Sequence, residues 1–222
     1  MTIQDYFGGW SNVVDLAEAN RIMQRLVISK TSLCPQPSEI FRAFRMCPLR
    51  KLRVIICGQD PYSDGKATGI AFANFPGTKE ECYSPSLEVL KESIIDYTVP
   101  HRTIIFEPDL EKWEAQGVLM LNSALSCEYG RTGSHSLLWR PFMQSLFLNL
   151  SKHTSGIVYV LMGIQAQGYE PYINKQFNYV IKTRHPSYYA RTKTKMPHSI
   201  WKEVNNILIG LNGQGIEWYE EY

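Results

Sequence analysis

The sequence predicts an α/β fold in which a central four-stranded parallel sheet lies between two layers of helices, a three-layer α/β/α arrangement. Four short apolar runs are continuous rather than alternating, which is typical of strands buried on both faces of a parallel sheet. Segments with helical periodicity separate these runs. The 222 residues show no break in composition, so we expect one domain over residues 1–222.

The four apolar runs are the expected strands. They cover residues 52–58 (LRVIICG), 118–125 (VLMLNSAL), 157–163 (IVYVLMG) and 179–185 (YVIKTRH). Ligand sites of open parallel sheets form beyond the carboxyl ends of the strands. The residues at and after these four ends are therefore where we expect chemistry.

Amphipathic segments supply the expected helices. They cover residues 13–28, 37–46, 86–97, 137–153, 164–173 and 198–211. The Ser/Thr/Gly-rich stretch 129–136 is expected to be a loop.

Composition excludes several classes of protein. With 44% hydrophobic and 20% charged residues, the chain is typical of a soluble globular protein, and we expect no membrane association. The N-terminus has no basic region followed by an apolar run, so we expect the protein to stay inside the cell. The odd number of cysteines and the lack of a C-x-x-C pair indicate buried free thiols rather than disulfides or a metal site, at Cys34, Cys47, Cys57, Cys82 and Cys127.

The net charge of +2 does not by itself indicate nucleic acid. Its distribution is more informative, because residues 182–195 (KTRHPSYYARTKTK) hold five basic residues, no acid and two adjacent tyrosines. This segment could be a phosphate-contacting stripe with aromatic side chains. A solvated basic loop explains the same composition.

Three polar residues at strand ends are candidates for chemistry. Asp60 follows the first strand within GQDPY, where Pro61 biases it away from helical geometry and holds its carboxylate at the sheet edge. Asn122 lies in the second run and His185 at the end of the fourth. An Asp-Pro turn or a single histidine is often structural. The functional interpretation requires that the acid, the amide and the imidazole meet in one narrow cleft.

Seven segments, in this order, resemble those of the family 1 uracil-DNA glycosylases, over about residue 50 to Trp218. GQDPY resembles the family's water-activating motif and GIAFAN its base-stacking stretch. YSPSLEVLKE resembles its proline-serine loop and EAQGVLMLNSALS the strand that reads uracil. GSHSLLWRPF, VYVLMGIQAQ and RHPSYYA resemble the loop and helix after that strand, the glycine-serine strand end and the DNA-intercalating loop.

The resemblance implies a reaction and two catalytic residues. Hydrolysis of deoxyuridine passes through a sugar cation and a departing uracil anion, so the site must stabilise opposite charges at two points. Asp60 would orient the attacking water and stabilise the sugar cation. His185 would hydrogen-bond uracil O2, helped by backbone N–H groups around Gln59. Because water is the nucleophile, no metal or other cofactor is implied.

The resemblance also implies the residues that bind the base. The side-chain amide of Asn122 can accept from uracil N3–H and donate to O4, and cytosine reverses both partners. Phe72 would stack on the base, and Tyr62 would occupy the space of the thymine methyl group. Without the resemblance, either ring could equally belong to the core.

DNA containing uracil, single- or double-stranded, is the implied partner. Ser86, Gly163 and Ser187 match positions that grip the DNA backbone. Tyr189 stands where the family has the leucine that enters the base stack, with Tyr188 and Arg191 beside it. A proteinaceous glycosylase inhibitor is a further possible partner, and we expect a monomer.

The chain departs from the family pattern at four positions. Ser63 replaces the usual histidine after the tyrosine, and Ile164 replaces a serine. Tyr188 and Tyr189 replace proline and leucine. Such departures are typical of divergent viral or mobile-element members.

Two other functions remain open at this point. The chain could be a catalytically weakened DNA-binding or replication-accessory relative that keeps the fold. It could also be a related glycosylase that acts on mismatched or damaged bases. The iron-sulfur type needs four suitable cysteines, and the mismatch type usually has asparagine where Asp60 stands.

Overall fold

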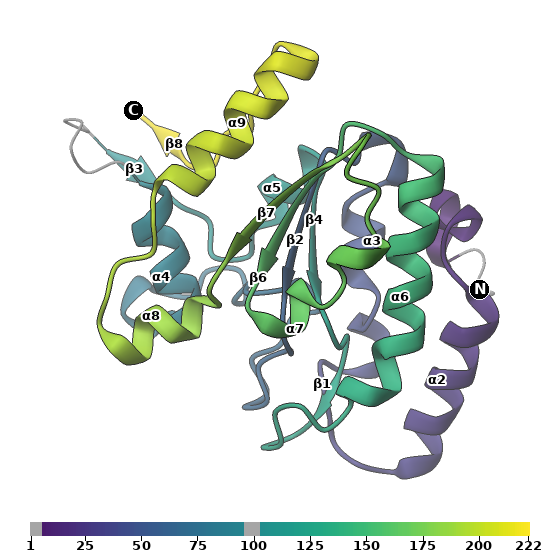
Figure 1. Cartoon of the computed structure of the whole chain (residues 1–222). Helices are drawn as coiled ribbons and strands as arrows, with labels where there is room; N and C mark the ends of the chain where they lie inside the picture. Colours follow the sequence, from purple (N-terminus) through teal and green to yellow (C-terminus); the bar gives the residue numbers. More distant parts are fainter. Residues whose placement is uncertain (1–5, 96–102) are drawn as a thin grey trace.

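The computed structural model describes residues 6–95 and 103–222, and its centre is a parallel sheet of four strands (Figure 1). The strands are β2 (Val54–Gly58), β4 (Val118–Asn122), β6 (Val158–Met162) and β7 (Tyr179–Thr183). Their order is β4-β2-β6-β7, and every neighbouring pair is parallel. The predicted fold class and the four-stranded sheet are thus confirmed, with each strand ending one to three residues before the predicted end or at it.

Two layers of helices cover the sheet (Figure 1). The strands alternate: Ile55 and Cys57 face one buried cluster, whereas Val54 and Ile56 face the other. The first cluster includes residues of α2 (Leu16–Ser29), α3 (Arg42–Met46), α6 (Ser136–His153) and α7 (Ile164–Gln167). The second includes residues of α4 (Pro85–Ile94), α5 (Glu111–Ala115), α8 (Pro186–Thr192) and α9 (Ser199–Asn212).

Some elements differ from the sequence prediction. The segment 164–173 is not one helix, because α7 ends at Gln167 and a separate 3-10 turn follows at Glu170–Tyr172. The predicted helix 37–46 is likewise a 3-10 turn at Pro37–Glu39 followed by α3. The predicted end of helix 86–97 lies partly outside the described residues.

Short elements without a strong sequence pattern were not predicted. They include α5, α8, two further 3-10 turns at Leu49–Lys51 and Glu80–Cys82, and one at Gly8–Asn12. Two small antiparallel pairs were also missed: β1 (Leu33–Cys34) with β5 (Cys127–Glu128), and β3 (Ile104–Ile105) with β8 (Glu220–Glu221). Two-residue strands are too short to show a hydrophobic period.

All five cysteines are free, but the prediction that all are buried is wrong for Cys82, which is exposed on a 3-10 turn. Within residues 6–95 and 103–222 no helix is long and apolar enough to cross a membrane. The same part of the chain contains no group of three His, Cys, Asp or Glu side chains placed to hold a metal ion.

Candidate active site

A cavity of about 320 Å³ lies at the carboxyl ends of the central strands. This volume is at the small end of the range for ligand pockets, which is about 300–1,000 Å³. The structure brings eight of the predicted site residues to its walls: Gln59, Asp60, Tyr62, Phe72, Ser86, Asn122, His185 and Ser187. The acid, the amide and the imidazole therefore meet in one cleft, as the functional interpretation requires.

The sheet itself places Asn122 in the cavity. Gly58 and Asn122 are the last residues of β2 and β4 and pair in register. Ser123 fixes this end, because its hydroxyl donates to the Gly58 carbonyl over 2.8 Å. A Cβ added at Gly58 would lie 2.6 Å from the Phe72 ring and 2.8 Å from Asn122 Oδ1. Only glycine lets the ring and the amide approach the same point of the backbone.

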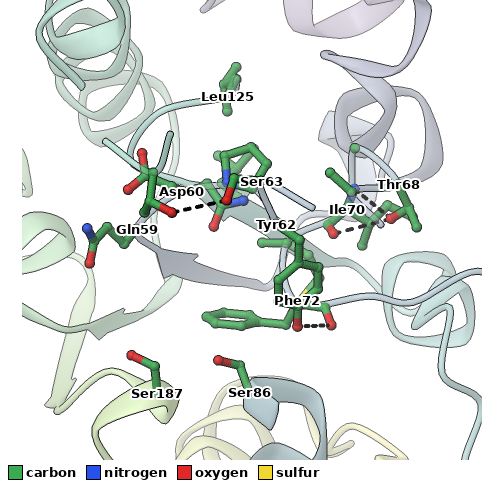
Figure 2. Close-up of a pocket in the computed structure, with 18 of the residues that line it drawn as sticks. Gln59, Asp60, Tyr62, Ser63, Thr68, Ile70, Phe72, Ser86, Leu125 and Ser187 are labelled. Carbon is green, nitrogen blue, oxygen red and sulfur yellow. Dashed lines mark hydrogen bonds between the residues drawn. The ribbon is translucent and has the colours of Figure 1, made fainter. Parts of the chain in front are cut away.

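The ring of Phe72 is held by a strained backbone. Phe72 has a φ of +66°, a left-handed conformation that costs about 1–3 kcal/mol for a residue with a side chain. The hydroxyl of Tyr62 donates to the Phe72 carbonyl over 2.9 Å, as the dashed line between them in Figure 2 shows. Tyr62 thus lines the cavity and also fixes the conformation of its neighbour.

A pair of buried residues connects the Phe72 segment to helix α4. The amide of Asn74 donates to Ser84 Oγ over 2.7 Å and accepts from the Ser84 backbone N–H over 2.8 Å. Ser84 precedes α4, so this pair places Ser86, in the first turn of the helix, at the edge of the cavity. The sequence analysis did not identify Asn74 or Ser84, because nothing local indicates that they meet.

His185 follows β7 and is oriented by the start of helix α8. Its Nδ1 accepts from the Ser187 backbone N–H over 3.2 Å and lies 2.9 Å from Ser187 Oγ. This assigns the proton to Nε2 in the neutral ring. Burial, together with the positive charge of Arg191, lowers the pKa of His185 to about 4. The ring is therefore neutral at physiological pH and has one N–H to donate.

Two further contacts fix the His185 ring. It lies 5.5 Å from the Phe72 ring, centroid to centroid. Gly163, at the end of β6, has a φ of +87°, and a Cβ there would lie 3.0 Å from the Cβ of His185. Gly163 is therefore a packing partner of His185 in this structure and does not itself line the cavity.

Asp60 presents an unpaired carboxylate. Both oxygens are buried and have no hydrogen-bond partner among the described residues. Burial raises the pKa of Asp60, and the nearby Gln59 side chain and Gly133 backbone only partly oppose this. A buried charged group without partners is costly, so its retention points to a ligand or water that completes its hydrogen bonds.

Two hydroxyl groups lie on the same side of the cavity as Asp60. Ser63 and Thr132 both line it, and their hydroxyl oxygens are 3.3 Å apart. Figure 2 shows Asp60 and Ser63 on the opposite side of the Phe72 ring from Ser86 and Ser187. The sequence analysis missed Thr132, because its stretch has only the composition of a loop.

The remaining predicted DNA-contacting residues lie on helix α8. Arg191 is exposed, and Tyr188 is half-buried with the Arg184 guanidinium 4.2 Å from its ring centroid. Tyr189 is buried in the core, with its hydroxyl 3.2 Å from Thr183 Oγ1. Entry into a base stack would require this ring to leave its contact, so the wedge role of Tyr189 stays a prediction.

The fold and the cavity together define a class: an α/β/α protein that can enclose one small flat ring between an aromatic side chain, an amide and an imidazole, opposite a carboxylate. A family model described as the uracil DNA glycosylase superfamily matches residues 44–209. The chain belongs to this superfamily. It is 33% identical over 190 residues to the uracil-DNA glycosylases of Yersinia pseudotuberculosis and Yersinia pestis, covering 84% of this chain and 81% of each relative.

Solved structures agree on the fold. Mimivirus uracil-DNA glycosylase superposes with a TM-score of 0.79 at 20% identity, over 97% of this chain and 86% of that one. A variant of mimivirus UNG in complex with UGI gives 0.78 at 20% identity, over 98% and 88%. UNG from Nitratifractor salsuginis gives 0.64 at 16% identity, over 97% and 96%.

Proposed function

We propose that this chain is a monofunctional uracil-DNA glycosylase, which hydrolyses the N-glycosidic bond of deoxyuridine in DNA and leaves an abasic site. The observation that carries the proposal is the meeting of Asp60, Asn122 and His185 in one small cavity. Membership of the superfamily and the names of the relatives support the same reaction.

The reaction separates charge along one line through the cavity. The oxygen of water forms a bond to C1′ of the sugar while the C1′–N1 bond breaks, and the bonding pair leaves with uracil as its N1 anion. Asp60 accepts one proton of the water and faces the cationic sugar. A carboxylate without protein partners in a water-poor site interacts with that cation more strongly than it would at a surface.

On the other side of the cavity, neutral His185 donates from Nε2 to uracil O2, where negative charge accumulates. Because the pKa of His185 is lowered to about 4, the ring is neutral at physiological pH and stabilises this charge as a hydrogen-bond donor. Backbone N–H groups around Gln59 act at the same oxygen.

Specificity for uracil comes from three side chains. The amide of Asn122 pairs with N3–H and O4, and a site built on such pairing can reject the wrong analogue by about 10⁴–10⁵. Phe72 stacks on the ring. Tyr62 takes the place of the thymine methyl group, and its hydrogen bond to the Phe72 carbonyl makes it a rigid barrier.

The DNA strand lies across the mouth of the cavity and helix α8. The hydroxyls of Ser86 and Ser187 and the backbone near Gly163 contact phosphates on either side of the flipped nucleotide. Arg191 adds a cation on the same helix. The complex of a mimivirus variant with UGI supports a proteinaceous inhibitor as a further partner. We further propose that the protein acts as a monomer inside the cell.

A cleavage assay tests the function directly. The purified chain should open abasic sites in a fluorescent oligonucleotide that contains one uracil, single- or double-stranded, and should do so in the presence of a chelator. Asp60→Asn and His185→Ala serve as controls that should reduce cleavage. No cleavage of either substrate would contradict the proposal, and excision of thymine from G·T at a comparable rate would contradict the role of Tyr62.

A further inference from the structure

We infer that Thr132, acting with Ser63, is a positioning residue for the attacking water, an inference that rests on the proposed glycosylase function. Thr132 is an exposed residue that lines the same cavity as Asp60, and its hydroxyl lies 3.3 Å from that of Ser63. Thr132 belongs to the loop after β5 and Ser63 to the loop after β2, so the pair forms only in the folded chain.

Asp60 alone cannot fix the orientation of a water molecule. An ionised carboxylate only accepts hydrogen bonds, so it holds one O–H of the water and leaves the other free to rotate. A hydroxyl group can accept that second O–H. With both O–H groups engaged, a lone pair of the water is left to face C1′, which is the orientation that the reaction requires.

Several backbone hydrogen bonds hold Thr132 in place. The Gly130 N–H donates to the Ser63 carbonyl over 2.7 Å and ties the two loops together. The Tyr129 N–H donates to the Ser32 carbonyl over 2.8 Å, and the Glu128 N–H to Ser134 Oγ over 2.8 Å. Thr132 therefore lies on a short segment that is anchored on both sides.

The proton balance leaves the two hydroxyls unchanged. As the water oxygen bonds to C1′ and the C1′–N1 pair leaves with uracil, one proton of the water passes to Asp60. The other proton stays on the oxygen, which becomes the hydroxyl at C1′ of the abasic sugar. Thr132 and Ser63 hold this retained O–H and neither gains nor loses a proton.

The test compares single-turnover cleavage rates with DNA affinity. Thr132→Val and Ser63→Ala should each lower the single-turnover rate by about tenfold, the value of one hydrogen bond. The double variant should lose little more than either single one, because the pair acts as a unit. The Kd for uracil-containing DNA should stay within about twofold, since neither hydroxyl binds the strand. Thr132→Ser, which keeps the hydroxyl, should recover the rate.

The chain offers a matched control in Ser29 and Thr31. Their hydroxyls are 3.1 Å apart, both residues are exposed, and neither lines the cavity. Ser29→Ala and Thr31→Val should leave the rate unchanged, and melting temperatures should show that all variants fold.

The outcomes separate this inference from the proposed function. One outcome is that the unaltered chain is active while Thr132→Val and Ser63→Ala both cleave uracil-containing DNA as fast as it does. In that case the inference is overturned and the proposed function stands. Weaker DNA binding with an unchanged single-turnover rate would assign the hydroxyls to a phosphate contact and would also overturn it. No cleavage by the unaltered chain would overturn both.

Discussion

The two sides of the cavity are built in opposite ways. The side formed by Asn122, Phe72 and His185 consists of a strand end, a buried ring and a half-buried ring, fixed by close packing around Gly58 and Gly163. The side formed by Asp60, Ser63 and Thr132 consists of two loops, and its carboxylate has no partner among the described residues. We refer to these as the base side and the water side.

Under the proposed function, the difference follows from what each side must do. The base side must distinguish one ring from similar rings, which requires donors and acceptors that do not move. The water side must leave a polar group unpaired so that a solvent molecule and a cationic sugar can pair with it. Packing stabilises the first, whereas the second costs stability.

The largest expected effect comes from removing the charge on the water side. Asp60→Asn removes the group that accepts the proton and faces the sugar cation, so the single-turnover rate should fall by about 10³-fold or more. Uracil-containing DNA should still bind with a similar Kd, because the base side is unchanged. A loss of less than about tenfold would show that the carboxylate is not the reacting group.

The same variant should be more stable than the parent chain. Burial raises the pKa of Asp60, so the folded state binds its proton more readily than the unfolded state, and stability falls as pH rises through this range. Asparagine carries no charge at any pH, and each 1 kcal/mol regained raises the Tm of a domain of this size by about 2–4 °C. Asp64→Asn, at an exposed residue of the same loop, is the control and should leave the Tm unchanged.

Two glycine substitutions compare the sides directly. Gly58→Ala should reduce activity by about 10²-fold, because its Cβ must displace the Phe72 ring and the Asn122 amide. Gly133→Ala adds a side chain at a φ of +81°, but the nearest atom is Ser136 Oγ at 3.8 Å. It should cost about 1–2 kcal/mol in stability from the left-handed backbone and have the smaller effect on rate. If Gly133→Ala lowered the rate more than Gly58→Ala, the base side would not be the side that depends on rigid packing.

The sequence predicted the base side better than the water side. The strand that ends at Asn122 and the strand that ends just before His185 are continuous apolar runs, and the rule that ligands lie beyond strand ends indicates where to look. The resemblance supplied Phe72 and Tyr62, whose rings the composition alone could not separate from core residues. Buried, regular elements leave a periodic signal in the sequence.

Thr132 and Asn74 show why the rest could not be predicted. Thr132 reaches the cavity because the Gly130 N–H meets the Ser63 carbonyl, a contact between loops more than sixty residues apart. Asn74 meets Ser84 across a turn that has no regular period. The burial of Tyr189 against Thr183 is a further example, since nothing in the sequence indicates that these two side chains meet. Contacts between irregular segments depend on tertiary packing.

A smaller effect is expected at the hydroxyl that supports the base side. Tyr62→Phe keeps the ring but removes the hydrogen bond to the Phe72 carbonyl, which is worth about 1 kcal/mol. The left-handed backbone at Phe72 then loses a restraint, so the rate should fall by about three- to tenfold, with a small decrease in Tm. Tyr83→Phe, whose hydroxyl also bonds a carbonyl but lies outside the cavity, should leave the rate unchanged.

The smallest effect is expected from a change in pH. It distinguishes the two sides, because the pKa of Asp60 is raised whereas the pKa of His185 is lowered. Because the pKa of His185 is about 4, its ring stays neutral and active as the pH falls from 8 to 5. Asp60 is active as the carboxylate, so its raised pKa should set the acid limb of the pH–rate profile. His185→Ala should therefore lower the rate at every pH and keep this limb, whereas Asp60→Asn should abolish it. An acid limb that disappears in the His185 variant instead would mean that the imidazole, not the carboxylate, controls the reaction below neutral pH.

The lowered pKa of His185 should also affect stability. Between pH 6.5 and 4 the unfolded chain binds more protons at His185 than the folded chain does, so the Tm of the parent chain should fall relative to that of His185→Asn as the pH falls.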